Sequence, residues 1–177
     1  MKFLFLFLIL IFSPQDIFSE WDPNLESNSA LSKFQREKDL IIYFEKAYAY
    51  VIFPKIVKVG FVLGGAGGKG EIFQGDELIG CSRLSQAKVG LIWGGNSYSQ
   101  IIFIQNKETL KKFMEGNFEF GGDVSGQFFT KGGGIVAAFK DGIAISTISI
   151  KGLGYDVSLA GQSFKSKEPN DEGNCIW

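Results

Sequence analysis

An eight-residue motif occurs twice in this chain, at an offset of thirty residues. The first copy, KVGFVLGG, begins at Lys58, and the second, KVGLIWGG, begins at Lys88. The three positions that differ exchange one apolar residue for another, and the correspondence extends to Ile72–Phe73 and Ile102–Phe103. Glycines inside strands mark bulges, bends or close approaches of two backbones. We therefore expect the paired glycines at equivalent points of bent β-strands: Gly64, Gly65, Gly94 and Gly95.

The first copy overlaps a stretch with six glycines among eleven residues, from Gly60 to Gly70. A phosphate-binding loop of this kind needs a lysine, then a hydroxyl residue, then a helix. Here Gly70 follows Lys69 where the hydroxyl residue would be, and the spacing is one residue short. The second copy also has no lysine equivalent to Lys69. We assign these glycines to architecture and expect no nucleotide ligand.

Length and composition limit the class of protein. A chain of 177 residues fits one domain with a sizeable core. Hydrophobic residues make up 45%, and 18 phenylalanines and 23 glycines indicate a β-rich globular fold. The formal charge of −1 is not that of a general nucleic-acid binder. We expect no nucleic-acid partner.

The first residues resemble an export signal. Lys2 is followed by ten apolar residues and then by Ser13–Pro14. This matches the charged and apolar regions of a secretory signal, and ten apolar residues are too few to span a bilayer. We expect a signal peptide over 1–19, a polar lead-in over 20–29, one domain over 30–165 and a polar tail over 166–177. The expected location is periplasmic or secreted, including a peripheral position at a membrane.

The pattern of apolar residues predicts an α+β fold rich in strands. From Ala30 to about Tyr50 the apolar residues recur at helical spacing, and Pro54 is expected to close the segment after a short β-like run, AYVIF. Beyond it the period becomes two, with hairpins expected around Gly75–Asp76 and Asp141–Gly142. NKETLKKFMEG predicts a helix near 106–115. We expect a bent antiparallel sheet that closes into a small barrel or sandwich.

No catalytic or metal-binding constellation emerges from the sequence. Histidine is absent, which removes the commonest general base and metal ligand. The two cysteines, Cys81 and Cys175, cannot form a cysteine-rich zinc site, and the sequence leaves open whether they pair as a disulfide. We predict that the protein is not an enzyme and uses no metal or cofactor.

Three blocks of the sequence resemble a known family. They are AYAYVIFPKIVKVGFVLGGAGGKGEIF, SQAKVGLIWGGNSYSQIIFIQNKETLKKFMEGNFEFGGDVSG and ISTISIKGLGYDVSLAGQSF. Their order and spacing are similar to those of the SYLF domain, also called the Ysc-type actin-binding or DUF500-like domain, here in an exported, bacterial-type form. The resemblance assigns a structural role to most motif residues: Phe53, Pro54, Gly60, Gly64, Gly65, Gly68, Gly70 and Gly121.

The resemblance implies a lipid-binding module, with a phospholipid or membrane surface as the partner. The head group would be an anionic phospholipid or of the phosphoinositide type, and the alternative is a protein-interaction module of the actin-binding or envelope-structural kind. Lys58 and Lys69 are the charged motif residues, and Lys88 is equivalent to Lys58 in the repeat. Basic residues of the N-terminal helix are further candidates: Lys33, Arg36 and Lys38. That helix either meets lipid through Leu31, Phe34 and Ile41 or packs them on the sheet.

Overall fold

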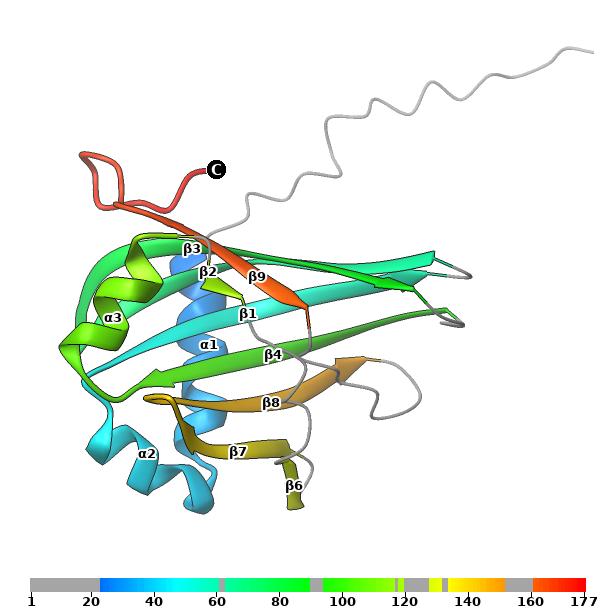
Figure 1. The fold of residues 1–177 in the computed structure, drawn as a ribbon, viewed down its shortest axis with the longest axis horizontal. Coiled ribbons are helices and arrows are strands. Elements are labelled where there is room, and N and C mark those ends of the chain that lie inside the picture. The colour runs from blue at the N-terminus through cyan, green and yellow to red at the C-terminus, as the bar shows by residue number, and fades with distance from the viewer. Residues whose placement is uncertain are drawn as a thin grey trace, which may run out of the picture.

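The computed structural model describes residues 23–60, 63–89, 94–116, 118–119, 128–131, 134–151 and 161–177. Within these ranges nine strands form one antiparallel sheet, in the order β5-β9-β3-β2-β1-β4-β8-β7-β6 (Figure 1). The strands are β1 (Ala49–Gly60), β2 (Leu63–Gln74), β3 (Glu77–Val89), β4 (Gly94–Ile104), β5 (Phe118–Glu119), β6 (Phe128–Lys131), β7 (Gly134–Lys140), β8 (Ile143–Lys151) and β9 (Gln162–Lys167). The helices are α1 (Pro23–Gln35), the 3-10 helix η2 (Lys38–Leu40), α2 (Ile41–Lys46) and α3 (Lys107–Met114).

The strand order confirms a bent antiparallel sheet and shows that the sheet is open. Strands β1, β2 and β3 are joined in sequence, and β4 returns to lie beside β1, which is the Greek-key order. The two outermost strands of the described sheet, β5 and β6, do not pair with each other. The expected closure into a barrel is therefore not formed among these strands.

Helices cover both faces of the sheet. On one side, which we call the α1 face, Phe34 of α1 packs against Ile52 and Ile101. On the other side, the α3 face, Phe113 of α3 packs against Phe164 of β9, with ring centroids 5.4 Å apart. Because side chains alternate along a strand, each long strand contributes to both cores.

The thirty-residue repeat has a structural counterpart. Strands β2 and β4 lie on opposite sides of β1 and pair with it at equivalent positions. Gly60 pairs with both Gly64 and Gly94, and Val59 pairs with both Gly65 and Gly95. Further along, Val51 pairs with both Ile72 and Ile102. The prediction that the glycine pairs occupy equivalent points of strands is confirmed.

Pro54 does not end the first strand, contrary to the sequence-based expectation. Strand β1 continues to Gly60, and its register against both neighbouring strands shifts by one residue around Pro54. A β-bulge is one of the few places in a central strand that tolerates a proline, because it leaves one residue out of the ladder. The Pro54 carbonyl accepts a hydrogen bond from Ser99 Oγ at 2.8 Å.

The predicted continuous helix from Ala30 to Tyr50 is wrong. The helix α1 begins earlier, at Pro23, and ends at Gln35, and two short helices follow before β1. Phe34 and Leu40 are both buried on the α1 face. Because Phe34 and Leu40 are six residues apart, a single continuous helix would direct their side chains about 120° away from each other. The break at Glu37, whose backbone is extended, lets both side chains reach the sheet and leaves Ile41 exposed.

Both predicted hairpins and the predicted internal helix are confirmed. Gly75 has φ of 61° in the turn between β2 and β3, and Asp141 and Gly142 have φ of 52° and 80° between β7 and β8. Asn106 caps α3, since its side chain accepts a hydrogen bond from Thr109 N at 2.9 Å. Gly116 follows the helix with φ of 75°.

Replacing the capping side chain should destabilise the fold modestly. Asn106→Ala removes the acceptor for the Thr109 N–H, and we expect the free energy of unfolding to fall by about 1 kcal/mol. Asn106→Asp keeps an acceptor and should stay within about 0.5 kcal/mol of the wild type. Urea denaturation of the three proteins measures the difference. Equal losses for both variants would mean that the cap does not act through this bond.

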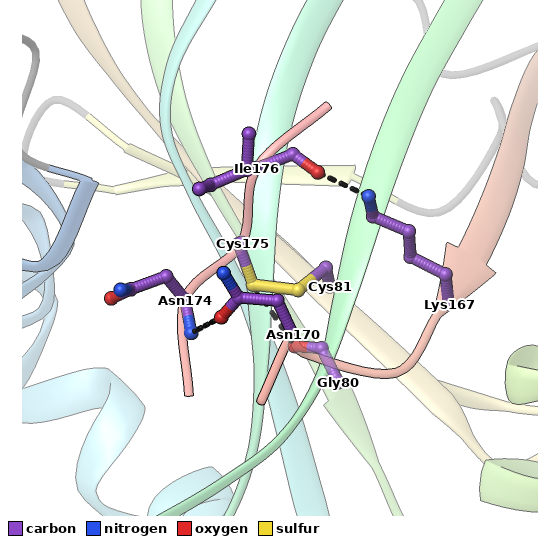
Figure 2. The surroundings of a disulfide bond; sticks show 7 residues. All are labelled: Gly80, Cys81, Lys167, Asn170, Asn174, Cys175 and Ile176. Carbon is purple, nitrogen blue, oxygen red and sulfur yellow. Dashed lines mark hydrogen bonds between the residues drawn. A yellow bond between two sulfur atoms is a disulfide. The ribbon is translucent and has the colours of Figure 1, made fainter. Parts of the chain in front are cut away.

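A disulfide pins the C-terminal segment, residues 168–177, to the sheet. Cys81 of β3 and Cys175 are bonded, and both are buried (Figure 2). Lys167 Nζ donates a hydrogen bond to the Ile176 carbonyl, and Asn174 N donates to Asn170 Oδ1 at 2.6 Å. The polar tail expected from the sequence is therefore attached to the domain. No helix in the described part of the chain is long and apolar enough to cross a membrane.

Candidate binding surface

Four basic residues lie opposite one another on four adjacent strands. Lys55 of β1 pairs with Lys69 of β2, Lys69 pairs with Arg83 of β3, and Arg83 pairs with Lys165 of β9. We call these four residues the basic row. Lys69 is half-buried and the other three are exposed. The row lies on the α1 face. Ile56, the residue after Lys55, is buried on the α3 face, and successive side chains of a strand point to opposite faces.

The basic row places like charges at short range. The Cβ atoms of residues directly opposite in an antiparallel pair lie about 5 Å apart, and like charges in that position destabilise the sheet. Lys167 adds another cation on the same face, opposite Cys81. Buried Glu71, two residues from Lys69 on the same face of β2, places one negative charge beside the row. An anion bound over the exposed cations would offset the rest of the repulsion, so this arrangement suits an anionic ligand.

The glycines beside Lys69 explain its position. A Cβ on Gly68 would lie 2.8 Å from the Ile56 side chain and 2.9 Å from the Lys55 carbonyl oxygen. A Cβ on Gly70 would lie 2.6 Å from the Phe53 ring and 2.7 Å from the Ile52 carbonyl oxygen. The two glycines let β2 approach bulged β1 closely, while Lys69 between them faces the opposite side. The GKG motif is therefore architectural at its glycines and presents one cation.

The inner end of the row borders a pocket beneath α1. The pocket has a volume of about 390 Å³ and lies between α1 and strands β1, β4 and β8. Lys33 of α1 and Lys55 of β1 both line it, together with Glu26, Ser99 and Ile150. One predicted helix lysine is thus brought beside the basic row.

At the outer end, the pinned C-terminal segment contacts the row. The Trp177 ring lies 5.1 Å from the Arg83 guanidinium carbon and 4.6 Å from Lys167 Nζ, measured to the ring centroid. Cation–π contacts of this kind are each worth about 0.5–1 kcal/mol when exposed. Trp177 therefore helps to order two cations at this edge of the sheet.

The structure separates the lysines that the sequence grouped together. Lys58 is only 4% exposed and belongs to the α3 face, whereas Lys69 belongs to the α1 face. Lys88 pairs with Gly64 near the end of β3. Lys33, Arg36 and Lys38 are exposed on or after α1. The motif residue Gly121 lies outside the described residues.

The α3 face also carries a buried polar cluster, formed by Tyr98, Gln100 and Gln162. Gln162 Nε2 donates to Tyr98 Oη at 3.2 Å, and the side-chain amides of Gln100 and Gln162 bond to each other at 3.0 and 3.3 Å. Burial raises the pKa of Tyr98 well above its ordinary value, and the Gln162 hydrogen bond offsets this only in part. Tyr98 therefore stays a neutral hydroxyl at physiological pH, so this cluster is suited to fixing strand positions rather than to proton transfer.

Within the described residues, no three His, Cys, Asp or Glu side chains gather where they could hold a metal ion. The residues that the sequence-based analysis missed are Arg83 and Lys165. Lys55, Lys69 and Arg83 are evenly spaced, fourteen residues apart. That spacing becomes a signal only when the strand registers are known.

An open antiparallel sheet with helices on both faces and a basic row on one of them is the framework of a binding module. Residues 85–172 match the family described as Ysc84: Las17-binding protein actin regulator. Over this range the sequence matches that family, in agreement with the SYLF resemblance seen in the sequence. The family is known for actin binding and lipid binding. The chain matches no curated protein and no solved structure.

Proposed function

We propose that this protein binds anionic phospholipid at a membrane surface of the cell envelope, with the basic row as its contact. The observation that carries the proposal is the alignment of Lys55, Lys69, Arg83 and Lys165 on one face. A chain with a net charge of −1 has no general attraction to anions. Its attraction must therefore come from a local cluster. The lipid-binding record of the family supports the same choice of ligand.

The expected strength follows from the number of cations. Each basic residue held near an anionic membrane is worth about 1 kcal/mol, so the four residues of the basic row supply up to about 4 kcal/mol. The attraction is screened within roughly 8 Å at physiological salt. Binding should therefore need anionic lipid and weaken as salt increases.

Charge reversal in the row should abolish most of this binding. Lys55→Glu with Arg83→Glu removes two attractive charges and adds two repulsive ones. We expect at least about thirtyfold weaker binding to vesicles that contain phosphatidylglycerol. Flotation across a range of salt concentrations measures the loss.

The matched control reverses two exposed lysines elsewhere. Lys111 and Lys112 lie on α3, which packs on the other face of the sheet. Lys111→Glu with Lys112→Glu changes the net charge equally and should float nearly as the wild type does. Equal flotation of both double variants would contradict the basic row as the contact. A wild-type protein that floats with no vesicle but sediments with actin filaments would instead favour the protein-binding alternative.

A further inference from the structure

Beyond the basic row, the α1 face ends in a surface of small and apolar residues. Val57 and Val59 follow Lys55 on the same face of β1, two and four residues further on. They pair with Gly67 and Gly65 of β2, which pair in turn with Ser85 and Ala87 of β3. We call this surface the tip face; its residues are Val57, Val59, Gly65, Gly67, Ser85 and Ala87.

The valines of the tip face are open to solvent. Val57 is 44% exposed and Val59 is 57% exposed, although both lie in a central strand of the sheet. Strands β1, β2 and β3 run past α1 at the end away from α3, so the helix does not cover this part (Figure 1). A Cβ atom added to Gly67 would lie 3.7 Å from its nearest neighbour, the Leu84 carbonyl oxygen, so the space above this glycine is open. The two valines therefore stand above a floor of small residues.

The positive charge of the neighbouring basic row indicates what kind of ligand binds this surface. The basic row lies about 7 Å from Val57 and about 13 Å from Val59 along the strand direction. An apolar patch next to a row of cations is complementary to the boundary of an anionic bilayer, where phosphates lie beside acyl chains. A soluble polyanion would use the cations alone and leave the valines in water.

We propose that the tip face rests on the acyl boundary of a lipid surface while the basic row holds its phosphates. This inference rests on the proposed function and deepens it, because it makes the ligand a lipid surface rather than a free phosphorylated molecule. Val57 and Val59 supply a component of binding that persists in high salt. The row and the tip face then form one continuous contact.

Isosteric substitution tests the apolar component. Val57→Thr with Val59→Thr keeps the shape and β-branching of both side chains but replaces a methyl group with a hydroxyl group. We expect about tenfold weaker binding to phosphatidylglycerol vesicles. The companion variant, Val57→Ile with Val59→Ile, adds one methylene at each position and should strengthen vesicle binding severalfold. Flotation in low and high salt measures both, and thermal unfolding verifies that both variants are folded.

A soluble ligand separates this inference from the proposed function. Inositol hexakisphosphate should bind the threonine variant as it binds the wild type, since it meets only the cations. If both valine variants bind vesicles like the wild type, the tip face is not part of the contact, whereas the basic row can still be. If the wild type binds no anionic vesicle, the proposed function itself fails. Altered self-association in ultracentrifugation, with vesicle binding unchanged, would assign the face to a second copy and overturn the inference.

Discussion

Breaking the disulfide between Cys81 and Cys175 is expected to lower the free energy of unfolding by about 4 kcal/mol. The bond joins residues separated by 94 positions. In the chain-entropy description, closing a loop of that length restricts the unfolded chain by about 4–5 kcal/mol. Total stabilities of domains are about 5–15 kcal/mol, so this one bond accounts for a large share. For a chain of this size the melting temperature should fall by about 10 °C.

The measurement compares the protein with and without a dithiol reductant. Calorimetry of the oxidised wild type should give the higher melting temperature, and the reduced wild type should match the double variant Cys81→Ser, Cys175→Ser. The double variant is the control, because the reductant has no bond to cleave in it. Equal melting temperatures for oxidised and reduced wild type would contradict a stabilising role. Disulfides persist in oxidising compartments, so the bond also supports the proposal that the chain is exported.

The position of Cys175 illustrates what the sequence leaves undecided. Its neighbours are polar, and the sequence by itself predicts an exposed tail. In the structure, a turn over residues 170–174 directs Cys175 toward β3, where its Sγ also lies 3.7 Å from the Gly80 carbonyl oxygen. The pairing of two cysteines depends on how close the chain brings them, and no local pattern encodes that distance.

Local signals predicted the local elements well. The capping residue Asn106, the turn at Gly75–Asp76 and the turn at Asp141–Gly142 all lie where turn and cap chemistry placed them. The repeat also predicted correctly that the glycine pairs are equivalent. Each of these features depends on a few neighbouring residues. For that reason the sequence was sufficient for them.

The basic row was hidden by two shifts of register. From the turn at Gly75–Asp76, an unbroken hairpin would place Ser82 opposite Lys69. An irregularity between Ile72 and Phe73 moves the pairing by one residue, to Arg83. The bulge at Pro54 likewise brings Lys55 opposite Lys69. Because a slip of one residue exchanges the two faces of a strand, the row could not be derived from periodicity.

Register also determines where Lys58 lies. A lysine in a glycine-rich motif is easily assigned to a ligand, and regular alternation along the strand would place Lys58 on the same face as Ile52, the α1 face. Beyond the bulge, Lys58 follows Ile56 on the α3 face, where it lies opposite Ala66 and Asn96. Its side chain is buried there. The glycine-rich motif therefore drew attention to a lysine that is buried against the sheet.

The second large effect is expected at the glycines that allow β1 and β2 to approach. In Gly70→Ala the new methyl group would overlap the Phe53 ring and the Ile52 carbonyl oxygen, at 2.6 and 2.7 Å. The ring is fully buried and packs on Phe164, with centroids 5.7 Å apart, and the carbonyl belongs to the backbone of a central strand. Neither can move without disturbing the core. We expect a loss of about 3 kcal/mol in the free energy of unfolding.

The same strand supplies graded controls for this prediction. At Gly67 a Cβ would meet nothing closer than 3.7 Å, and at Gly65 it would lie 3.1 Å from the Gln86 carbonyl oxygen. Neither glycine has a positive φ, so alanine is compatible with the backbone at both. Gly67→Ala should change stability by less than about 0.5 kcal/mol, and Gly65→Ala should lie between the other two variants. Urea denaturation of the three variants should give that order. A similar loss at all three positions would show that the glycines act through strand flexibility, whereas the predicted order places the requirement at the close approach beside the Pro54 bulge.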